Sequence, residues 1–593
     1  MNSLPSPHTP PPNPHMLGRG SLAAGLLLNT NLNFESFSQM RLKKILRDLL
    51  TVSVTEARNA GKLDFADLPA FEVEAPKLSE HGDFAANIAL TLASQAKQPP
   101  RRLAEIIVKG LVAPAGMLGR VEIAGPGFIN FFIEDTYWYQ VLPEIHRLGS
   151  AYGDSDLGRG RKVQVEFVSA NPTGPLHVGH GRGAALGDAL ANLLAATGHE
   201  VVREYYINDV GTQILTLGKS LYFRLRELQG EVVEFPADGY QGEYIIDIAK
   251  TLEKNGFPPE TLLDEEGMLA LGRYGADLIL AGIQKDLEDF GVYFDRWFSE
   301  AELYRQGLVE RSFDLLKEKG YLYEHDGALW FRASEWGDEK DRVVQRRSGA
   351  TTYFASDVAY HLHKFQQGFD LVVDLWGADH HGYVPRLQAA IEALGFKGRL
   401  KTILVQLVSL LRHGQPVAMT TRGGTFVTLE EVVAEVGKDA ARFIFLSRRP
   451  DAHLEFDLEL AKEQSSENPV YYVQYAHARL ASVFRQAAAQ GVEVSAPAPA
   501  FAARLTLPEE LGLLKMLANY PELVEGAARN LEPHRLTYFL TELASGLHSY
   551  YYKHRFITDD LNLTQARLCL VKGVKTVLHH GLNILGVAAP ESM

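Results

Sequence analysis

The strongest constraint on the fold is a strand–helix–strand pattern in residues 163–206. The apolar run Val163–Val168 predicts a buried strand, and a loop rich in proline and glycine follows it. His180–Ala196 predicts a helix closed by Gly198, and Val201–Tyr206 predicts a second strand. Strands joined through a helix pair in parallel, and helices cover both faces of parallel sheets. The pattern therefore predicts an open α/β sheet.

The rest of the chain is organised around this unit. Further β-branched runs after residue 370 predict more buried strands, so a mostly helical insertion at about residues 215–345 interrupts the sheet. Thr428 and Glu431 form a predicted capping box, and the pattern after them is helical almost to the end. The 593 residues predict three or four domains. We expect an N-terminal extension, an α+β domain, the α/β domain and a helical domain, at residues 1–39, 40–148, 149–427 and 428–593.

The first 39 residues differ in composition from the rest. Six prolines fall within residues 5–14, and Arg19 and Glu35 are the only charged residues. Such a segment buries too little apolar surface to fold, so we expect it to be disordered. Helical periodicity begins near Met40, which we expect to be the natural start of translation.

Composition excludes several classes of protein. Hydrophobic residues make up 46% and charged residues 22%, as in ordinary soluble domains, and no run of about 18 apolar residues predicts a membrane span. The single cysteine, Cys569, excludes a disulfide framework and a cysteine-rich zinc site, so we expect no dedicated metal site. The net charge of −14 argues against coating nucleic acid through a global basic field.

A candidate ligand site lies where the first strand of this unit runs into its helix. The stretch Glu166–His180 passes through a Pro/Gly loop to a helix N-terminus, where free backbone N–H groups and the helix dipole attract anions. His177 and His180 share one side of the first turn, and Gly179 between them permits close approach of a flat ligand. The stretch suits the phosphates of a nucleotide.

Other interpretations of this stretch stay open at this point. Two histidines at this spacing can simply cap and pack the helix, or bind zinc, although no cysteine or third ligand lies at a known spacing. The glycines Gly181, Gly183 and Gly187 resemble a dinucleotide fingerprint. Their spacing is one residue too long, however, and that motif has no use for the histidines.

His177-Val-Gly-His180, which follows a strand and opens a helix, resembles the HIGH motif of class I aminoacyl-tRNA synthetases. The longer string Ser169–Arg182 is similar to the arginyl-tRNA synthetases in particular, and the similarity extends from about residue 40 to the end. Further segments carry it in order: Tyr205–Gln213, Gly242–Ala249, Phe290–Glu300, Tyr353–Asp357, Gly377–Gly382, Tyr472–Arg479 and Leu585–Met593.

The resemblance implies a Rossmann-like class I catalytic domain with a helical insertion, an α+β N-terminal domain that contacts tRNA and an all-α C-terminal bundle that binds the anticodon. It implies an arginine–tRNA ligase, which activates L-arginine with ATP to arginyl-adenylate and transfers the arginyl group to the 3′ end of tRNA(Arg). ATP is then a substrate, accompanied by Mg²⁺ that phosphate and water hold. We expect a monomer that acts in the cytoplasm and binds no membrane.

The resemblance also implies roles for particular residues. His177 and His180 stabilise the phosphates in the transition state, and Tyr475 and Arg479, at i and i+4 of one helix, contact tRNA. Residues expected at the ATP are Gly179, Gly377, Asp379, His380 and Met419. Residues expected in the arginine pocket are Glu166, Ser169, Asn171, Gln213, Tyr353 and Asp357. A guanidinium is a planar, permanently charged fork, which carboxylates and planar acceptors bind best.

The chain departs from the family pattern at the second signature loop. Class I synthetases usually carry lysines there that hold the β- and γ-phosphates, whereas Ala418 and Thr421 stand at the two lysine positions of Val417–Gly424. Some members have a lysine just before the HIGH motif instead, but Gly174 occupies that place here. Either Arg422 supplies the missing charge, or a residue from elsewhere does, or the enzyme is slow. We expect Arg422 to supply it as a catalytic residue.

Two other functions stay open. One is another class I synthetase, although a cysteinyl enzyme needs a metal site that one cysteine cannot supply, and a glutamyl enzyme needs a basic pocket where Glu166 and Asp357 are acidic. The other is a tRNA-binding relative without catalysis, which the absent lysines permit. If tRNA binds, the net charge of −14 must be unevenly distributed. We expect the face that spans the N-terminal domain, the mouth near His177 and the helix of Tyr475 to be markedly more positive than the opposite face.

Overall fold

A five-stranded parallel sheet is the centre of the structure, a computed structural model that describes residues 42–255, 264–417 and 426–593. Its strands are β5 (Lys162–Glu166), β6 (Glu200–Ile207), β7 (Arg296–Ser299), β11 (Leu371–Gly377) and β12 (Leu400–Val405). They lie in the order β12-β11-β5-β6-β7, and every neighbouring pair is parallel. The chain thus adds β6 and β7 on one side of the central β5 and then adds β11 and β12 on the other side, as in Rossmann-type domains. The predicted Rossmann-like sheet is confirmed.

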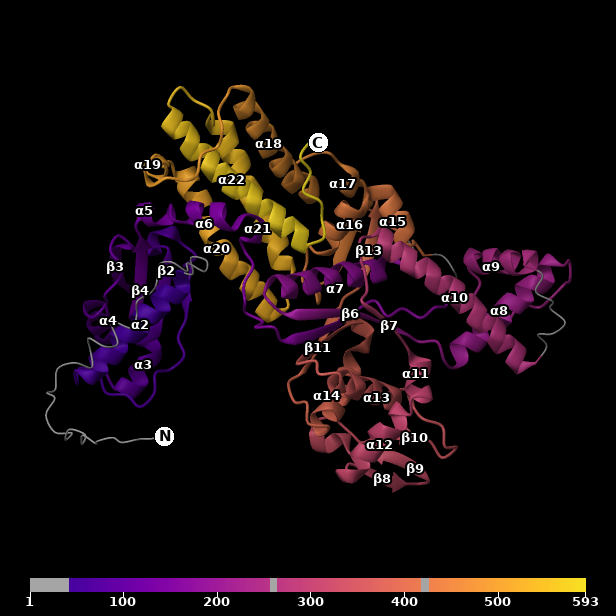
Figure 1. Ribbon diagram of the computed structural model, residues 1–593. Helices are drawn as coiled ribbons and strands as arrows, with labels where there is room; N and C mark the ends of the chain where they lie inside the picture. The colour runs from indigo at the N-terminus through magenta and orange to yellow at the C-terminus, as the bar shows by residue number, and fades with distance from the viewer. Residues whose placement is uncertain (1–41, 256–263, 418–425) are drawn as a thin grey trace, which may run out of the picture. The chain divides into compact units, whose positions relative to one another are not determined.

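The strand–helix–strand unit has the predicted form. The helix between β5 and β6 is α7 (Val178–Ala196), which begins before the predicted residue. It packs on β5 and β6, while α13 (Tyr353–Gln366) and α14 (Val384–Ala393) lie on the opposite side of the sheet (Figure 1). A Cβ atom on Gly187 would lie 2.1 Å from the Phe167 ring. Glycine at this position therefore allows α7 to lie close to the end of β5.

The predicted insertion is divided in two by a strand of the main sheet. Its first part holds three helices that pack together, α8 (Thr212–Leu228), α9 (Glu243–Lys254) and α10 (Glu265–Asp289) (Figure 1). Its second part follows β7 and holds α11 (Glu300–Arg305), α12 (Leu308–Glu318), β8 (Leu322–His325), β9 (Ala328–Phe331) and β10 (Arg342–Gln345). The insertion expected as a single block at about residues 215–345 is therefore two insertions, one before and one after β7. The sequence did not indicate β7, because four residues show too little periodicity to be recognised as a strand.

The residues before β5 form a separate antiparallel sheet with helices. The sheet order is β1-β2-β4-β3, from β1 (Val73–Glu74), β2 (Phe84–Ala86), β3 (Leu118–Ala124) and β4 (Phe128–Ile133). The helices are α2 (Leu42–Asn59), α3 (Ile88–Ala96), α4 (Pro100–Lys109), α5 (Asp135–Trp138) and α6 (Val141–Leu148). The predicted α+β character of this part is confirmed. The extension predicted at residues 1–39 lies outside the described residues.

The last part of the chain is mostly helical, as predicted, but it includes one strand. Thr428 caps α15 (Leu429–Val436) and forms the predicted capping box with Glu431. After α16 (Lys438–Phe445), β15 (Leu454–Asp457) pairs with β13 (Val408–Arg412), which also pairs with β14 (Gln415–Pro416). The remaining helices are α17 (Leu458–Lys462), α18 (Pro469–Ala489), α19 (Pro499–Ala502), α20 (Pro508–Asn530), α21 (His534–Lys553) and α22 (Leu561–Ile584). The predicted helical bundle is confirmed from α17 onward. The strand β15 lies before it, and the sequence did not indicate this strand because four alternating residues are too few to identify one.

A fully buried arginine fixes the start of α7 against the loops around it. The Arg182 guanidinium donates to three backbone carbonyls at 2.7–2.9 Å, those of Gln406, Arg449 and Ala452. Buried carbonyls need hydrogen-bond donors, and a guanidinium supplies several in one plane. The helix that carries the two predicted histidines is thereby anchored from within.

The close packing of α8 and α10 generates a prediction about stability. A Cβ on Gly272 of α10 would lie 2.1 Å from the Ile214 carbonyl oxygen, whereas nothing lies within 4 Å of a Cβ on Gly282 of the same helix. Gly272→Ala should separate the helices and lower the midpoint of thermal unfolding. Gly282→Ala should raise it, because alanine favours helix over glycine by about 0.5–1 kcal/mol. Melting curves followed by circular dichroism test this, and equal midpoints for the two variants would contradict it.

Candidate active site

Polar side chains occupy the carboxyl ends of three strands of the main sheet, and a glycine ends a fourth. Glu166 ends β5, Asn208 follows β6, Glu300 follows β7 and Gly377 ends β11. Parallel pairing brings these ends to one edge, and the direction in which strands are added reverses between β5 and β11. Open α/β sheets bind their ligands outside the carboxyl ends at such a reversal. This edge is therefore the expected place for an active site.

A cavity of about 440 Å³ lies at this edge, within the size range of small-molecule sites. Residues predicted for arginine or ATP that line it are Glu166, Ser169, Asn171, Tyr353, Asp357, Gly377 and His380. Tyr353 and Asp357 reach it from the start of α13, one turn apart on the same face as expected. The structure thus brings together predicted residues that are distant in sequence.

Other lining residues had no part in the sequence-based prediction. They are Val168, Tyr206, Asn208, Glu300, Tyr360, His361, Leu375, Trp376 and Tyr383. Asn208 and Glu300 each come directly after a strand, and that position is the signal that could have identified them. Tyr360 and His361 follow Asp357 by three and four residues on α13, so helical spacing places all three on one face.

The cavity contains two carboxylates that form no ion pair with a lysine or arginine of the described residues, Asp357 and Glu300. Burial raises the pKa of Asp357 to about 6. Burial, together with Asp357 and Asp209, raises the pKa of Glu300 to about 7. Carboxylates that disfavour each other's ionisation are stabilised by a cation bound between them. The cavity is therefore suited to a cation with several N–H donors.

The third acid of the cavity, Glu166, already has a cation. Lys364 Nζ on α13 lies 2.5 Å from its Oε2, and Ser169 Oγ donates to its Oε1 at 3.0 Å. Glu166 is 6% exposed, and Lys364 is fully buried. Glu166 is thus a fixed part of the cavity wall rather than an unpaired charge.

The turn that follows β5 has unusual backbone angles. Val168 and Ser169 have φ values of 68° and 39°, a region that residues with side chains rarely adopt. Ser169 Oγ accepts from the Tyr206 backbone N–H at 3.1 Å, which holds the turn against β6. Such strain persists only where the surroundings fix it, and it is concentrated at binding sites.

His177 and His180 cap the N-terminus of α7 with their own rings. His177 Nδ1 accepts from the N–H groups of Gly179 at 3.1 Å and His180 at 3.4 Å, and His180 Nδ1 accepts from the His177 N–H at 3.3 Å. The two rings stack with their centroids 3.7 Å apart. The interpretation of these histidines as helix caps is therefore correct. Because the caps use only Nδ1, they leave Nε2 for a ligand.

The caps also determine the state of the imidazoles. Since Nδ1 accepts in both rings, the proton of the neutral form is on Nε2, which becomes an N–H donor. Burial lowers the pKa of His177, and burial and His177 lower the pKa of His180 to about 3. Both rings are thus neutral donors near pH 7. A Cβ on Gly179 would lie 3.0 Å from the His177 ring, so this glycine makes room for the cap.

The start of α7 pairs with the residues after the second signature loop. Leu429 N–H donates to the Leu176 carbonyl at 2.8 Å, and His177 and Thr428 form a β-bridge. The N-caps of α7 and α15 are therefore side by side. The loop itself lies outside the described residues, and with it Ala418, Met419, Thr421 and Arg422.

Three described residues predicted for arginine or ATP do not line the cavity: Gly179 at the start of α7, and Gln213 and Asp379. Gln213 is exposed in the first turn of α8. A Cβ atom added to Gly211, two residues before it, would lie 3.8 Å from the Tyr353 hydroxyl, so this turn lies close to the cavity. Asp379 is exposed in the short turn after β11, beside His380. Gln213 and Asp379 lie near the rim, and their predicted roles remain predictions.

Tyr475 and Arg479 lie one turn apart on α18 and contact each other. The Arg479 guanidinium donates to the Tyr475 hydroxyl at 3.0 Å and lies 4.4 Å from the ring centroid of Tyr551. The neighbouring Tyr552 is 82% exposed. Aromatic rings and a guanidinium on one surface can stack on unpaired bases and contact phosphates.

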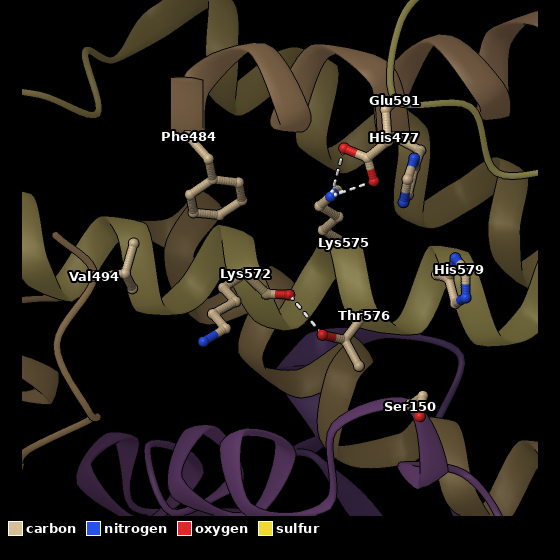
Figure 2. Close-up of a pocket in the computed structure, with 9 residues that line it drawn as sticks. All are labelled: Ser150, His477, Phe484, Val494, Lys572, Lys575, Thr576, His579 and Glu591. Atoms are coloured by element: carbon tan, nitrogen blue, oxygen red, sulfur yellow. Dashed lines mark hydrogen bonds and ion pairs between the residues drawn. The ribbon is translucent and has the colours of Figure 1, made fainter. Parts of the chain in front are cut away.

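A second cavity, of about 460 Å³, lies near the C-terminus between α18 and α22 (Figure 2). Lys575 contacts both carboxylate oxygens of Glu591, at 2.7 and 2.9 Å. His477 donates to the Pro590 carbonyl at 2.8 Å. These contacts anchor the C-terminal segment to two helices, and we interpret the cavity as a consequence of that anchoring.

Two further findings apply to residues 42–255, 264–417 and 426–593. None of the helices in these ranges is long and apolar enough to cross a membrane. No three of their His, Cys, Asp or Glu side chains gather in a way that could hold a metal ion.

Comparison with known proteins identifies the class. Family models match three regions: the arginyl tRNA synthetase N-terminal domain at residues 41–133, the class I (R) tRNA synthetase catalytic domain at 145–254 and 271–480, and the DALR anticodon-binding domain at 473–593. Together with the parallel sheet and the histidines at the start of α7, these matches define a class I aminoacyl-tRNA synthetase.

Individual proteins narrow this result to one family. The chain is 55% identical to the arginine–tRNA ligases of Syntrophotalea carbinolica and Geobacter sp. strain M21, over 93% of its own length and the whole of each relative. The chain belongs to the arginyl-tRNA synthetase family. A putative arginyl-tRNA synthetase from Campylobacter jejuni, 35% identical, matches 78% of this chain and all of its own with a TM-score of 0.71. The arginyl-tRNA synthetase of Thermus thermophilus, 23% identical, shares the fold over 93% of this chain and all of its own, with a TM-score of 0.74.

Proposed function

We propose that this chain is an arginine–tRNA ligase, which activates L-arginine with ATP and transfers the arginyl group to the 3′ end of tRNA(Arg). The observation that carries the proposal is the pair Asp357 and Glu300, two carboxylates in one cavity that have no lysine or arginine partner within the described part of the chain. Glu300 follows β7 and Asp357 lies on α13, at the sheet edge where β5 leads into the start of α7. By the family resemblance, that helix start binds ATP. The pair fits a substrate that brings its own delocalised positive charge.

We assign the substrate guanidinium to Asp357 and Glu300. A guanidinium offers five N–H donors in one plane, enough to contact both carboxylates at once. Tyr353 and Asn171 line the same cavity, and Glu166 provides a wall whose charge Lys364 already neutralises. A glutamate side chain would be repelled by Asp357 and Glu300, which disfavours the glutamyl alternative.

We assign the phosphates of ATP to the start of α7. The Nε2–H groups of His177 and His180 and the helix N-terminus are donors that suit phosphate oxygens. Gly377 and His380, at the end of β11, lie near enough to contact adenosine or arginine. Roles for Gly179, Met419, Asp379 and Gln213, and compensation of the absent lysines by Arg422, remain predictions. Mg²⁺ would accompany ATP, held chiefly by phosphate and water, and it would neutralise phosphate charge.

The chemistry needs position and charge rather than covalent participation by the protein. In the first step an oxygen of the arginine carboxylate bonds to the α-phosphorus, and the bond to pyrophosphate breaks. Binding both substrates at one sheet edge makes this attack effectively intramolecular. Neutral N–H donors then stabilise the charge that develops on the phosphates. In the second step a hydroxyl of the terminal ribose attacks the adenylate carbonyl, and AMP leaves.

The tRNA would contact α18 through Tyr475 and Arg479. Their surface also carries Tyr551 and Tyr552, so it offers several rings to unpaired bases. The α+β part of the chain would contact tRNA elsewhere. A monomeric state and action in the cytoplasm complete the proposal and rest on the family resemblance.

The direct test uses the purified chain with ATP, L-arginine, Mg²⁺ and tRNA(Arg). Labelled arginine should become acid-precipitable with the tRNA. His177→Asn should keep the thermal midpoint, because asparagine is a strong N-cap, yet lower kcat by roughly 10²–10³-fold, because it lacks the Nε2–H donor.

The controls separate two interpretations. If the wild type binds tRNA(Arg) but forms no arginyl-tRNA, the chain is a tRNA-binding relative without catalysis. If the wild type is active and His177→Asn retains full kcat, the ring donor has no catalytic role.

The two unpaired carboxylates predict a pH dependence for arginine. Bound guanidinium stabilises the ionised carboxylates, so arginine affinity should be complete above pH 7 and should weaken as pH falls through about 7 and 6, the pKa values of free Glu300 and Asp357. This loss of affinity toward low pH is the acid limb of the arginine profile, and the histidines do not contribute to it, since both have lowered pKa values. Measured from pH 5.5 to 8.5, kcat/KM for arginine should show the acid limb, whereas KM for ATP should not change with pH in this way.

Glu300→Gln provides the matched variant. It keeps the shape of the side chain and removes the charge, so KM for arginine at pH 8 should rise by about 10–100-fold, and the part of the limb near pH 7 should disappear. An unchanged limb would show that Glu300 does not titrate in the arginine site.

Arg479 tests the tRNA surface. Arg479→Met keeps the aliphatic stem, so it should raise KM for tRNA about tenfold and reduce the salt dependence of tRNA binding by about one ion, with KM for arginine unchanged. Arg529→Met is the control, because Arg529 is an exposed arginine of α20 that pairs only with Glu525 one turn away among the described contacts. Equal effects of the two variants would exclude a specific role for Arg479.

A further inference from the structure

Three buried carboxylates lie in a row across the main sheet. Asp374 on β11 is the register partner of Glu166 on β5, and Glu166 is the register partner of Glu204 on β6. They are 0%, 6% and 1% exposed, respectively. Like charges on neighbouring strands repel, and burial makes an unpaired charge more costly. This carboxylate row is therefore stable only with cations supplied from nearby.

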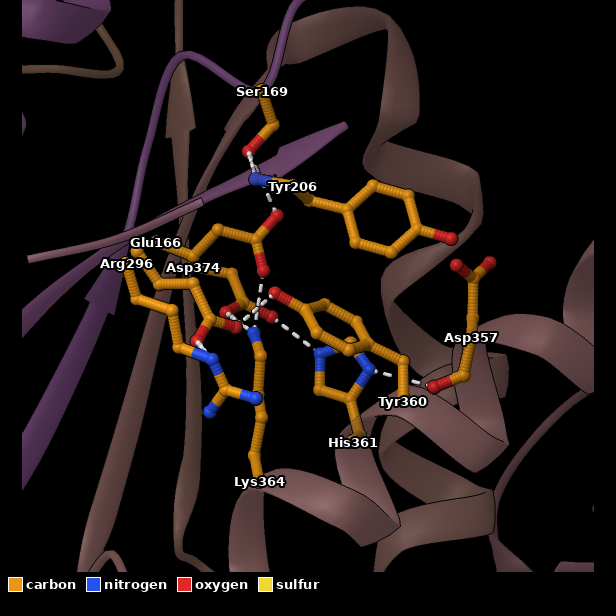
Figure 3. Close-up of polar contacts among 10 residues, drawn as sticks. Glu166, Ser169, Tyr206, Arg296, Asp357, Tyr360, His361, Lys364 and Asp374 are labelled. Carbon is orange, nitrogen blue, oxygen red and sulfur yellow. Dashed lines mark hydrogen bonds and ion pairs between the residues drawn. The ribbon is translucent and has the colours of Figure 1, made fainter. Parts of the chain in front are cut away.

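Lys364 is the cation that joins two members of the carboxylate row. Its Nζ lies 2.5 Å from Glu166 Oε2 and 3.0 Å from Asp374 Oδ1, and it lies 4.2 Å from the centroid of the Tyr360 ring. Figure 3 shows the lysine reaching from α13 to both carboxylates. Burial alone would lower its pKa, but Asp374 and Glu166 raise it above the usual value, so Lys364 stays charged.

His361 links the carboxylate row to the helix turn that carries Asp357. One ring nitrogen lies 2.8 Å from the Asp357 carbonyl oxygen, and the other lies 2.6 Å from Asp374 Oδ2. Both partners are acceptors, so both ring nitrogens act as donors. Although burial opposes ionisation of Asp374, Lys364 and His361 lower its pKa. The turn of α13 with Asp357 is thus linked to β11 through the His361 ring (Figure 3).

The third acid of the row has its own partners. Tyr360 hydroxyl donates to Glu204 Oε1 at 2.5 Å, and Arg296 Nε on β7 lies 3.3 Å from Glu204 Oε2. Lys364 and Arg296 are thus the lysine and arginine that contact the row, and His361 adds a further hydrogen-bond contact. Among the described residues, Asp357 and Glu300 have no such cation.

We propose that Lys364 is the positioning residue of the arginine pocket: it fixes the Glu166 carboxylate to the sheet and to α13, so that Asp357 and Glu300 alone remain to bind the substrate cation. The inference rests on the proposed function. Without Lys364, Glu166 becomes a third unpaired carboxylate in the same cavity. Arginine can then bind to it in a wrong position, with its own carboxylate displaced from the α-phosphate.

The test is Lys364→Met, which keeps the stem and removes the charge. We expect kcat/KM for arginine to fall about tenfold or more, with KM for ATP within about twofold, and the acid limb of the arginine profile to move up by about one pH unit. A merely structural lysine would not shift that limb or separate the two substrates. Lys515→Met is the matched control, since Lys515 also contacts a carboxylate, Asp83 at 2.5 Å, and the face of Trp138.

A second variant separates positioning from stability. Lys364→Met with Asp374→Asn removes one cation and one anion, so the net charge of the row is unchanged and the fold should survive. We expect its thermal midpoint to recover while kcat/KM for arginine stays low. Recovery of both quantities in the double variant, or an unchanged kcat/KM for arginine in the single variant, would overturn the inference. Failure of the wild type to form arginyl-tRNA would instead overturn the proposed function.

Discussion

The candidate site depends on the parallel pairing of β5 with its two neighbours, β6 and β11. This pairing brings the carboxyl ends of the strands to one edge and places their side chains in register. The cavity at that edge, the turn that carries Val168 and Ser169, and the start of α7 all follow from where β5 ends. The same register also places the carboxylates of Asp374, Glu166 and Glu204 side by side beneath the site, where they repel one another. Lys364 and Arg296 compensate this repulsion by contacting these carboxylates.

The sequence predicted the parts of the site that local pattern controls. The strand, the Pro/Gly loop and the helix around Glu166 and His177 are continuous in the chain, and Tyr353 and Asp357 share a helix face by spacing alone. The strand β7 has four residues, and without it nothing marked Glu300 as the residue at a strand end. The sequence did not predict a role for Lys364, because a lysine in a helix is ordinarily exposed to solvent. Only the tertiary packing shows that this lysine is buried.

The acidic residues near the cavity are of two kinds, and the distinction explains how a buried site can both fold and bind a cation. Acids with internal cations, such as Glu166 and Asp374, contribute to the structure and cannot accept a second charge readily. Asp357 and Glu300 have raised pKa values instead, so a bound cation would favour their fully ionised forms. Under the proposed function, part of the net charge of −14 belongs to the arginine site and carries no information about affinity for nucleic acid.

The mutual capping of His177 and His180 has a consequence for motion. Each ring is fixed by backbone N–H groups of its own helix, and that helix is anchored by Arg182. Neither ring can rotate to follow a nucleotide without uncapping α7. Under the proposed function, the two Nε2–H donors are therefore oriented before the nucleotide binds, and little reorganisation accompanies the reaction at this point. Any adaptation to the changing shape of the phosphates has to come from other segments, so this helix start acts as the stationary reference against which the rest of the site adjusts.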